Sequence, residues 1–120
     1  MPEAVLLVYT YCTDPAREDE FNRWYDDVHI PDVLKAPHIV GATRYRLSGP
    51  PPRNGGEPHA TYLAIYQLDT DDTRGVMKGL NEHSKHLIEA GRMIDCLGLV
   101  STTTYIQSGA RAGVTVKGRS

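Results

Sequence analysis

His29 is the side chain of this sequence that is best suited to proton transfer. It follows a segment whose apolar residues recur at the spacing of a helix with one apolar face, namely Phe21, Trp24, Tyr25 and Val28. Pro31 has no backbone N–H to donate and biases the preceding residue away from helix, so we expect the helix to end near Val28. An imidazole at that end, beside acidic groups and aromatic rings, can take or give a proton near neutral pH.

Two carboxylates flank this histidine at the same spacing. Asp26 lies three residues before His29, and Asp32 lies three residues after it. Either carboxylate could orient the imidazole and stabilise its protonated form. Tyr25 could donate a hydrogen bond to a developing oxyanion, a role that is also open to Tyr45. The structural alternative is that His29 only bonds a free backbone carbonyl at the end of the helix.

Tyrosine is unusually frequent for so small a chain, with seven tyrosines against one phenylalanine. Buried phenol hydroxyl groups need hydrogen-bond partners, and a pocket for phenolic or keto substrates would supply some of them. The candidates for this pocket are Tyr25, Tyr45, Tyr62 and Tyr66. The alternative is that the tyrosines reflect only the preference of strands for aromatic residues.

Arg44 and His83 are further candidates for binding a substrate. Arg44 lies in a predicted strand among small or apolar neighbours and could hold a carboxylate or an enolate; otherwise it forms a surface or dimer-edge ion pair. His83 flanks the apolar stripe of a predicted second helix and could touch the pocket, whereas His86 falls well off that stripe. These two histidines lack the third ligand that a zinc site needs. Because P-loop and dinucleotide-binding motifs are also missing from the sequence, we expect neither a metal nor a cofactor.

The composition argues against several classes of partner. The chain has 120 residues and a formal net charge of −2, and its basic residues are scattered, so nucleic acid is not an expected partner. The longest apolar run, Ala4 to Val8, is too short to cross a bilayer, so no membrane contact is expected. Cys12 and Cys96 could pair, but we interpret them as thiols. Free thiols, together with the lack of a secretory signal at the start of the sequence, favour a cytoplasmic location.

The predicted elements follow the order strand, helix, strand, strand, helix, strand. Strands are expected over residues 4–12, 40–47, 60–68 and 97–106, helices over residues 14–28 and 71–90, and a short helical turn over roughly residues 31–35. This βαββαβ order predicts an α+β, ferredoxin-like fold with a four-stranded antiparallel sheet, as one domain over residues 1–107 with a polar tail at 108–120. Two helices can cover only one face of such a sheet, while the strands carry apolar groups on both. We therefore expect a homodimer packed sheet to sheet.

The segment Trp24–Leu34, the following Pro37 and the strand residues Thr43–Tyr45 resemble the EthD-like branch of the dimeric α+β-barrel superfamily. The resemblance covers roughly residues 4–106. It implies a ferredoxin-like dimer with a pocket between the sheet and the helices of each subunit, and it adds Trp24 to the candidates for substrate binding. Relatives commonly have glycine after this proline, where the chain has His38. His38 is therefore either pocket chemistry particular to this chain or a tolerated surface change.

The superfamily includes polyketide cyclases, muconolactone isomerases, decarboxylases of polyketide acids and cofactor-independent monooxygenases, so the fold does not fix the reaction. We predict a cofactor-independent lyase, isomerase or cyclase that acts on an aromatic, lactone or polyketide-like small molecule through proton transfer by His29. The irregular segment 48–59, rich in proline and glycine, could act as a lid. Two alternatives stay open: a non-catalytic dimer that binds a small hydrophobic ligand or assists a partner enzyme, and a cofactor-free monooxygenase.

Overall fold

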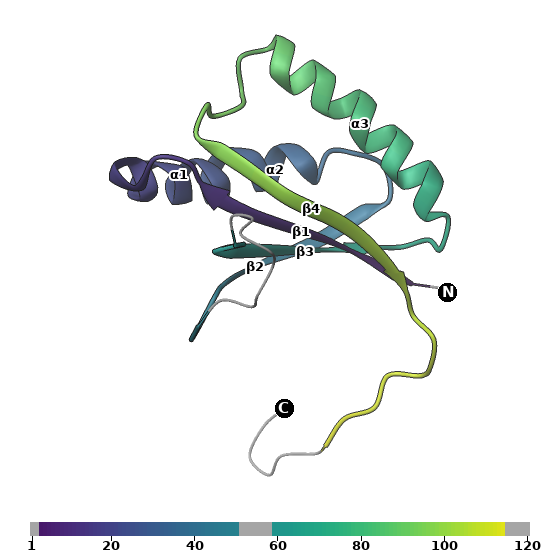
Figure 1. Ribbon diagram of the computed structural model, residues 1–120. Coiled ribbons are helices and arrows are strands. Elements are labelled where there is room, and N and C mark those ends of the chain that lie inside the picture. The colour runs from purple at the N-terminus through teal and green to yellow at the C-terminus, as the bar shows by residue number, and fades with distance from the viewer. Residues whose placement is uncertain (1–2, 51–58, 115–120) are drawn as a thin grey trace.

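The sheet is the centre of the fold, and the helices lie on one of its faces (Figure 1). The computed structural model describes residues 3–50 and 59–114. Its strands are β1 (Ala4–Cys12), β2 (Ile39–Arg46), β3 (Tyr62–Leu68) and β4 (Leu97–Ile106). They form one antiparallel sheet in the order β2-β3-β1-β4. The predicted ferredoxin-like α+β fold is therefore confirmed.

The helical layer begins and ends at residues that suit helix termini. It contains the short 3₁₀ turn η1 (Pro15–Arg17), α1 (Glu18–Trp24), the segment η2 (Tyr25–His29), α2 (Ile30–Val33) and α3 (Thr73–Glu89). Asp14 caps the first turn by accepting a hydrogen bond from the N–H of Ala16 at 3.1 Å. Asp72 caps α3 in the same way, accepting from the N–H of Gly75 at 3.1 Å. After α3, Gly91 has a φ of 70°, which glycine adopts most easily.

The first helix does not end near Val28 as predicted. It widens into the π-helical segment η2 and continues as α2, which contains Pro31. The N–H of Ile30 donates to the carbonyl of Tyr25, five residues earlier. In a regular α-helix the proline ring would collide with the carbonyl four residues before it, and the wider π turn relieves this conflict. His29 therefore lies inside a continuous helical run rather than at its end.

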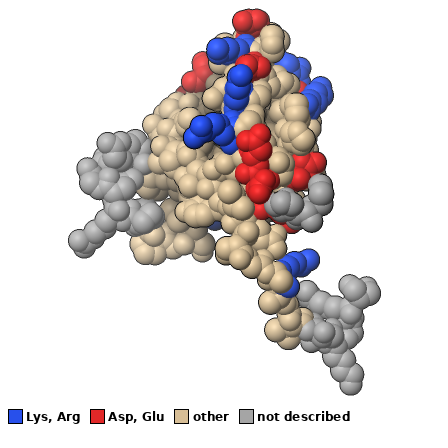
Figure 2. All heavy atoms as spheres, turned by 90° about the vertical axis from the view of Figure 1, so that its right-hand side faces the viewer, with Lys and Arg blue, Asp and Glu red and all other residues tan. Residues whose placement is uncertain are grey.

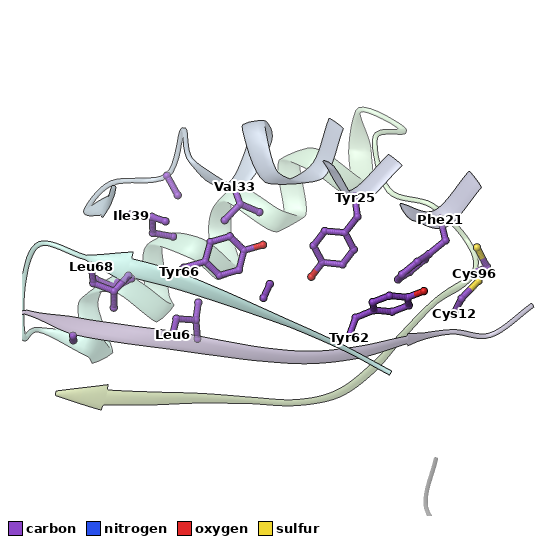
Figure 3. Close-up of a cluster of buried hydrophobic side chains, with 14 residues drawn as sticks. Leu6, Cys12, Phe21, Tyr25, Val33, Ile39, Tyr62, Tyr66, Leu68 and Cys96 are labelled. Atoms are coloured by element: carbon purple, nitrogen blue, oxygen red, sulfur yellow. The ribbon is translucent and has the colours of Figure 1, made fainter. Parts of the chain in front are cut away.

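The core lies between the sheet and the helices (Figure 3). Its most deeply buried large side chains include Leu6, Phe21, Tyr25, Tyr66 and Leu68. Phe21 meets the edge of the Tyr25 ring, with ring centroids 5.6 Å apart and an interplanar angle of 69°. At the same end of the core, Cys12 and Cys96 are buried free thiols whose sulfur atoms lie close together (Figure 3).

The opposite face of the sheet is not covered by any helix of the described residues. Leu7 of β1 pairs with Ile65 of β3 near its centre, and both are half-buried. Tyr45 and Tyr105, on the two outer strands, are 53% and 60% exposed. Seen from one side, charged side chains gather at the level of the helices, and the level of the sheet is mostly uncharged (Figure 2). This face is thus a half-exposed apolar surface.

Two predicted features fall partly outside the described residues. They are the proline- and glycine-rich segment 48–59, of which residues 51–58 are not described, and the polar tail, of which residues 115–120 are not described. Residues 108–114 of the tail contain no helix or strand. Among the helices of the described residues, none is both long and apolar enough to cross a membrane.

Candidate functional site

A cavity of about 230 Å³ lies between the sheet and the helices. Strands β1, β3 and β4 contribute one side of it, and η2, α2 and α3 contribute the other. Most of its wall is apolar, including Val8, Val33, Leu80, Met93 and Leu97. Its polar groups include Thr10, Tyr25, His29 and Tyr66. Because no Asp, Glu, Lys or Arg is among the described residues that line it, the cavity suits an uncharged molecule with a few hydrogen-bonding groups.

His29 is held in this cavity by two aromatic rings. Its imidazole stacks on the ring of Trp24, with centroids 4.7 Å apart and an interplanar angle of 20°, and it meets Tyr25 edge-on at 5.0 Å. Burial lowers the pKa of His29 to about 4, and the nearby positive charge of Arg44 acts in the same direction, while Asp32 opposes it. His29 is therefore neutral at physiological pH, which corrects the expectation of an imidazole that titrates near pH 7. A neutral imidazole has a free nitrogen lone pair and can accept a proton.

The same pKa shift predicts that the stability of the protein depends on pH. The pKa of His29 is about 4 in the folded state, against 6.5 for an ordinary histidine. The unfolded chain therefore binds more protons between these values, and the stabilising effect, complete above pH 6.5, is lost as the pH falls toward 4. We expect the free energy of unfolding to fall by about 2–3 kcal/mol over this window. Urea titrations from pH 7 to pH 4.5 measure the slope.

His29→Gln is the matched variant for these titrations because glutamine does not titrate. Its stability should vary much less than that of the wild type between pH 7 and pH 4.5. The pKa of the Asp32 carboxyl is lowered, so its contribution is lost at lower pH, outside this window. Equal slopes for the two proteins would contradict a buried, neutral His29.

The two flanking carboxylates bind arginines rather than His29. Asp26 is exposed and accepts a hydrogen bond from Nη1 of Arg44 at 2.9 Å. The buried carboxylate of Asp32 is held by Arg92, whose Nε and Nη2 lie 2.6 Å and 3.2 Å from its oxygens. Hydrogen bonding to Arg92 holds the pKa of Asp32 below its usual value. A π turn contains more residues than an α turn, so residues three apart within η2 no longer lie one above the other. This explains why Asp26 does not reach His29.

Three hydroxyl groups meet at the inner end of the cavity. The hydroxyl of Tyr25 lies near those of Tyr66 and Thr10, and burial raises the pKa of both tyrosines, so both are neutral donors. Thr10 is 1% exposed, and its Oγ1 has no well-aligned hydrogen-bond partner among the described residues. Thr10 belongs to no motif that would indicate a functional residue from the sequence. The available signal was a polar residue on the inward face of β1, two positions after Val8.

Arg44 and Tyr62, two of the predicted binding residues, lie behind the cavity and do not line it. The guanidinium of Arg44 lies 4.2 Å from the ring centroid of Tyr25 and 5.0 Å from that of Tyr62. Its Nη2 donates to Asn22 at 2.9 Å. The Tyr62 hydroxyl donates to Glu18 and accepts from Asn22, both at 3.0 Å. Arg44 therefore forms the ion pair that was its structural alternative, and it supports the cavity through Tyr25.

The remaining candidates hold the framework of the cavity or lie away from it. The Trp24 indole N–H donates to the carbonyl of Arg92 at 2.8 Å, which fixes the ring on which His29 stacks. Nε2 of His83 donates to the backbone carbonyl of Asp32 at 2.7 Å and so joins α3 to α2. Tyr45 lies on the exposed face of the sheet and lines a separate hollow there.

His38 is an exposed surface residue. Its Nδ1 is 2.8 Å from Asp69. Its φ of 69° is the left-handed conformation that glycine adopts without strain. His38 is not among the described residues that line the cavity. Within residues 3–50 and 59–114, no three His, Cys, Asp or Glu side chains are grouped so that they could hold a metal ion.

The fold and the cavity together define a class: a small ferredoxin-like α+β protein with an apolar cavity between sheet and helices. The chain belongs to the family described as "Domain of unknown function (DUF4286)", whose model matches residues 4–94. No curated protein matches it in sequence.

Solved structures agree with this class. HapK from Hahella chejuensis is similar with a TM-score of 0.63 at 17% identity, over 93% of this chain and 99% of that one. An EthD family protein from Bacillus halodurans is similar with a TM-score of 0.52 at 18% identity, over 92% and 100%. A monooxygenase from Streptomyces coelicolor, the product of ActVA-Orf6 in complex with nanaomycin D, has a TM-score of 0.50 at 14% identity, over 96% and 93%. The predicted resemblance to EthD-like proteins is confirmed at the level of the fold.

Proposed function

We propose that this protein binds an uncharged aromatic or polyketide-like molecule in its cavity and that His29 acts there as a general base. The observation that carries the proposal is a partly buried, neutral imidazole stacked on Trp24 and facing an apolar cavity without charged residues in its described lining. Such a base can take a proton from a phenolic hydroxyl or from a carbon next to a carbonyl group. Nanaomycin D in the Streptomyces structure supports a small-molecule ligand for this fold.

The surroundings of His29 suit the charges that proton transfer creates. When the imidazole accepts a proton it becomes positive, and the nearby negative charge of Asp32 favours that form. The substrate oxygen becomes negative, and the neutral hydroxyl of Tyr25 can donate a hydrogen bond to it. Asp32 therefore acts through its charge and Tyr25 through direct contact, while Asp26 only holds Arg44 in place.

Isomerisation and cyclisation both begin with proton abstraction of this kind, and we propose chemistry of this lyase or isomerase type. Decarboxylation fits less well, because its substrate would bring a carboxylate into a cavity whose described lining has no charged residue. Oxygen insertion is the second candidate reaction, because the similar structure from Streptomyces is that of a monooxygenase. A non-catalytic binding protein is the third possibility, since the cavity would hold the same ligands without turnover. The His29 variant argued in the Discussion separates catalysis from binding.

The uncharged lining predicts strong selection against carboxylates. At pH 7 we expect 4-ethylphenol to bind at least about tenfold more tightly than 4-hydroxybenzoate, because the carboxylate would lose its hydration without gaining a cation. Trp24 is the only tryptophan of the chain and contacts His29, so its fluorescence reports ligands that reach this histidine. His86→Gln, on the exposed side of α3, is the control and should bind both compounds like the wild type. Equal affinities for the two compounds would contradict the proposed ligand class.

We also propose that two copies pair through the open face of the sheet. The surface around Leu7 and Ile65 is apolar and half-exposed, and a second copy would remove it from water. Ile65→Arg should convert the dimer to a monomer in sedimentation experiments, because it places a charge at the centre of this face. Ile88→Arg makes the same change on α3, where the side chain is already 63% exposed, and should leave the dimer intact. A wild-type protein that sediments as a monomer at high concentration would contradict the pairing.

A further inference from the structure

We propose that Thr10 is the group that recognises a carbonyl oxygen of the ligand, so that the cavity selects hydroxy-ketones over simple phenols. This inference rests on the proposed function, because it names the ligand class of the same cavity. In the arrangement that we propose, the ligand carbonyl accepts a hydrogen bond from Oγ1 of Thr10, and the carbon next to that carbonyl, or a hydroxyl group beside it, faces the neutral imidazole of His29.

The unsatisfied hydroxyl of Thr10 is the first argument. The residue is 1% exposed and lines the cavity, yet its Oγ1 has no well-aligned hydrogen-bond partner among the described residues. Burying a hydroxyl group without a hydrogen bond is costly, so buried hydroxyl groups in folded proteins are nearly always paired. The Tyr25 hydroxyl lies beside this group, and a ligand oxygen that displaces it would accept the hydrogen bond of Thr10.

The backbone beside Thr10 is the second argument. The pairing of β1 with β4 changes register between Tyr9 and Thr10: Tyr9 pairs with Ser101, and Thr10 pairs with Leu99. One residue of β4, Val100, is therefore extra. As a result Leu99 and Thr102, which are three residues apart, both line the cavity. Bulges of this kind redirect side chains and are common beside functional sites.

The size of the cavity is the third argument. Its volume is about 230 Å³. An engineered cavity of about 150 Å³ binds benzene, so one substituted aromatic ring fits here. Its lining combines the hydroxyl groups of Thr10, Tyr25 and Tyr66 and the imidazole of His29 with apolar side chains that include Met77 and Leu80 of α3. An aromatic ring that carries oxygen groups matches this mixed lining.

The test compares two matched ligand series by the fluorescence of Trp24. The hydroxyacetophenones carry a carbonyl group, and the ethylphenols have the same shape without it; the 2-, 3- and 4-isomers of each are measured. The wild type should bind at least one hydroxyacetophenone about tenfold more tightly than its matched ethylphenol. Thr10→Val, which removes only the hydroxyl group, should abolish this preference, and Thr10→Ser should keep most of it.

Thermal unfolding without ligand separates recognition from a structural role. If the Thr10 hydroxyl has no hydrogen-bond partner until a ligand binds, Thr10→Val removes an unsatisfied buried group. The melting temperature of the variant should then rise by several degrees. A lower melting temperature would mean that the hydroxyl is structural and would overturn the inference. So would a wild type that binds both series equally, or a Thr10→Val variant that keeps the preference. A wild type that binds neither series would instead overturn the proposed function itself.

Discussion

Replacing His29 with glutamine is expected to reduce catalysed proton transfer by about 10²- to 10⁴-fold, the usual contribution of a general base. Glutamine keeps a polar group of similar reach in the cavity but cannot accept a proton at neutral pH. We therefore expect the affinity for hydroxyacetophenones to change by less than about threefold, because the glutamine amide can still form a hydrogen bond with the ligand. A loss of catalysis with retained binding is the signature of a base rather than of a binding residue.

The reaction can be followed before the natural substrate is known. A base beside a bound ketone should exchange the protons on the carbon next to the carbonyl group for deuterium in D₂O, and ¹H NMR measures this exchange directly. His86→Gln makes the same substitution at an exposed histidine of α3 and should exchange at the wild-type rate. If the wild type exchanges no faster than buffer over the whole panel while it still binds the ligands, the protein is the non-catalytic binder.

The pH profile of the exchange distinguishes His29 from other bases. Because burial lowers the pKa of His29 to about 4, the imidazole is already the free base at pH 5. The rate with the wild type should therefore be constant from about pH 5 upward and should fall only below that. A rate that falls between pH 7 and pH 6 would indicate a base with an ordinary histidine pKa and would contradict the assignment to His29.

The fold could be predicted because its signals are local. The predicted strands over residues 4–12 and 97–106 have the bounds that the structure has, and β2, β3 and α3 differ by one or two residues at their ends. The alternation of apolar and polar residues in strands, the capping residues of helices and the glycines at helix ends all act within a few residues of one another. The helix end near Val28 was wrong because the rule for proline assumes a regular α-helix, and the π turn removes the conflict on which that rule depends.

The electrostatics of the site could not be predicted in the same way. Spacing in sequence placed Asp26 and Asp32 beside His29, but their partners are Arg44 and Arg92, which are 18 and 60 residues away along the chain. The pKa of His29 depends on burial by elements that fold over it from elsewhere, so no local pattern contains it. Thr10 was missed for the same reason, because its missing hydrogen bond is visible only in three dimensions.

The aromatic cluster that supports His29 should also dominate the stability of the domain. Phe21 is completely buried, with its ring centroid 6.2 Å from Trp24, 5.6 Å from Tyr25 and 5.6 Å from Tyr62. Phe21→Ala would leave a void among these rings, and we expect it to reduce the free energy of unfolding by about 3–5 kcal/mol. Urea denaturation measures this change, and Ile88→Ala, at an exposed position of α3, should change it by less than about 0.5 kcal/mol.

A comparison of deuterium exchange with ligand affinity in Phe21→Ala tells whether this aromatic cluster also positions His29. Phe21 does not line the cavity, so Phe21→Ala removes no contact with a ligand. It does remove a neighbour of both Trp24 and Tyr25, the two rings that hold His29. At low temperature, where the variant is still folded, we therefore expect deuterium exchange to slow more than affinity falls, because the imidazole is held less firmly at the reacting atom. Exchange at the wild-type rate in the folded variant would mean that the contacts of Trp24 and Tyr25 with other parts of the chain are sufficient to position His29.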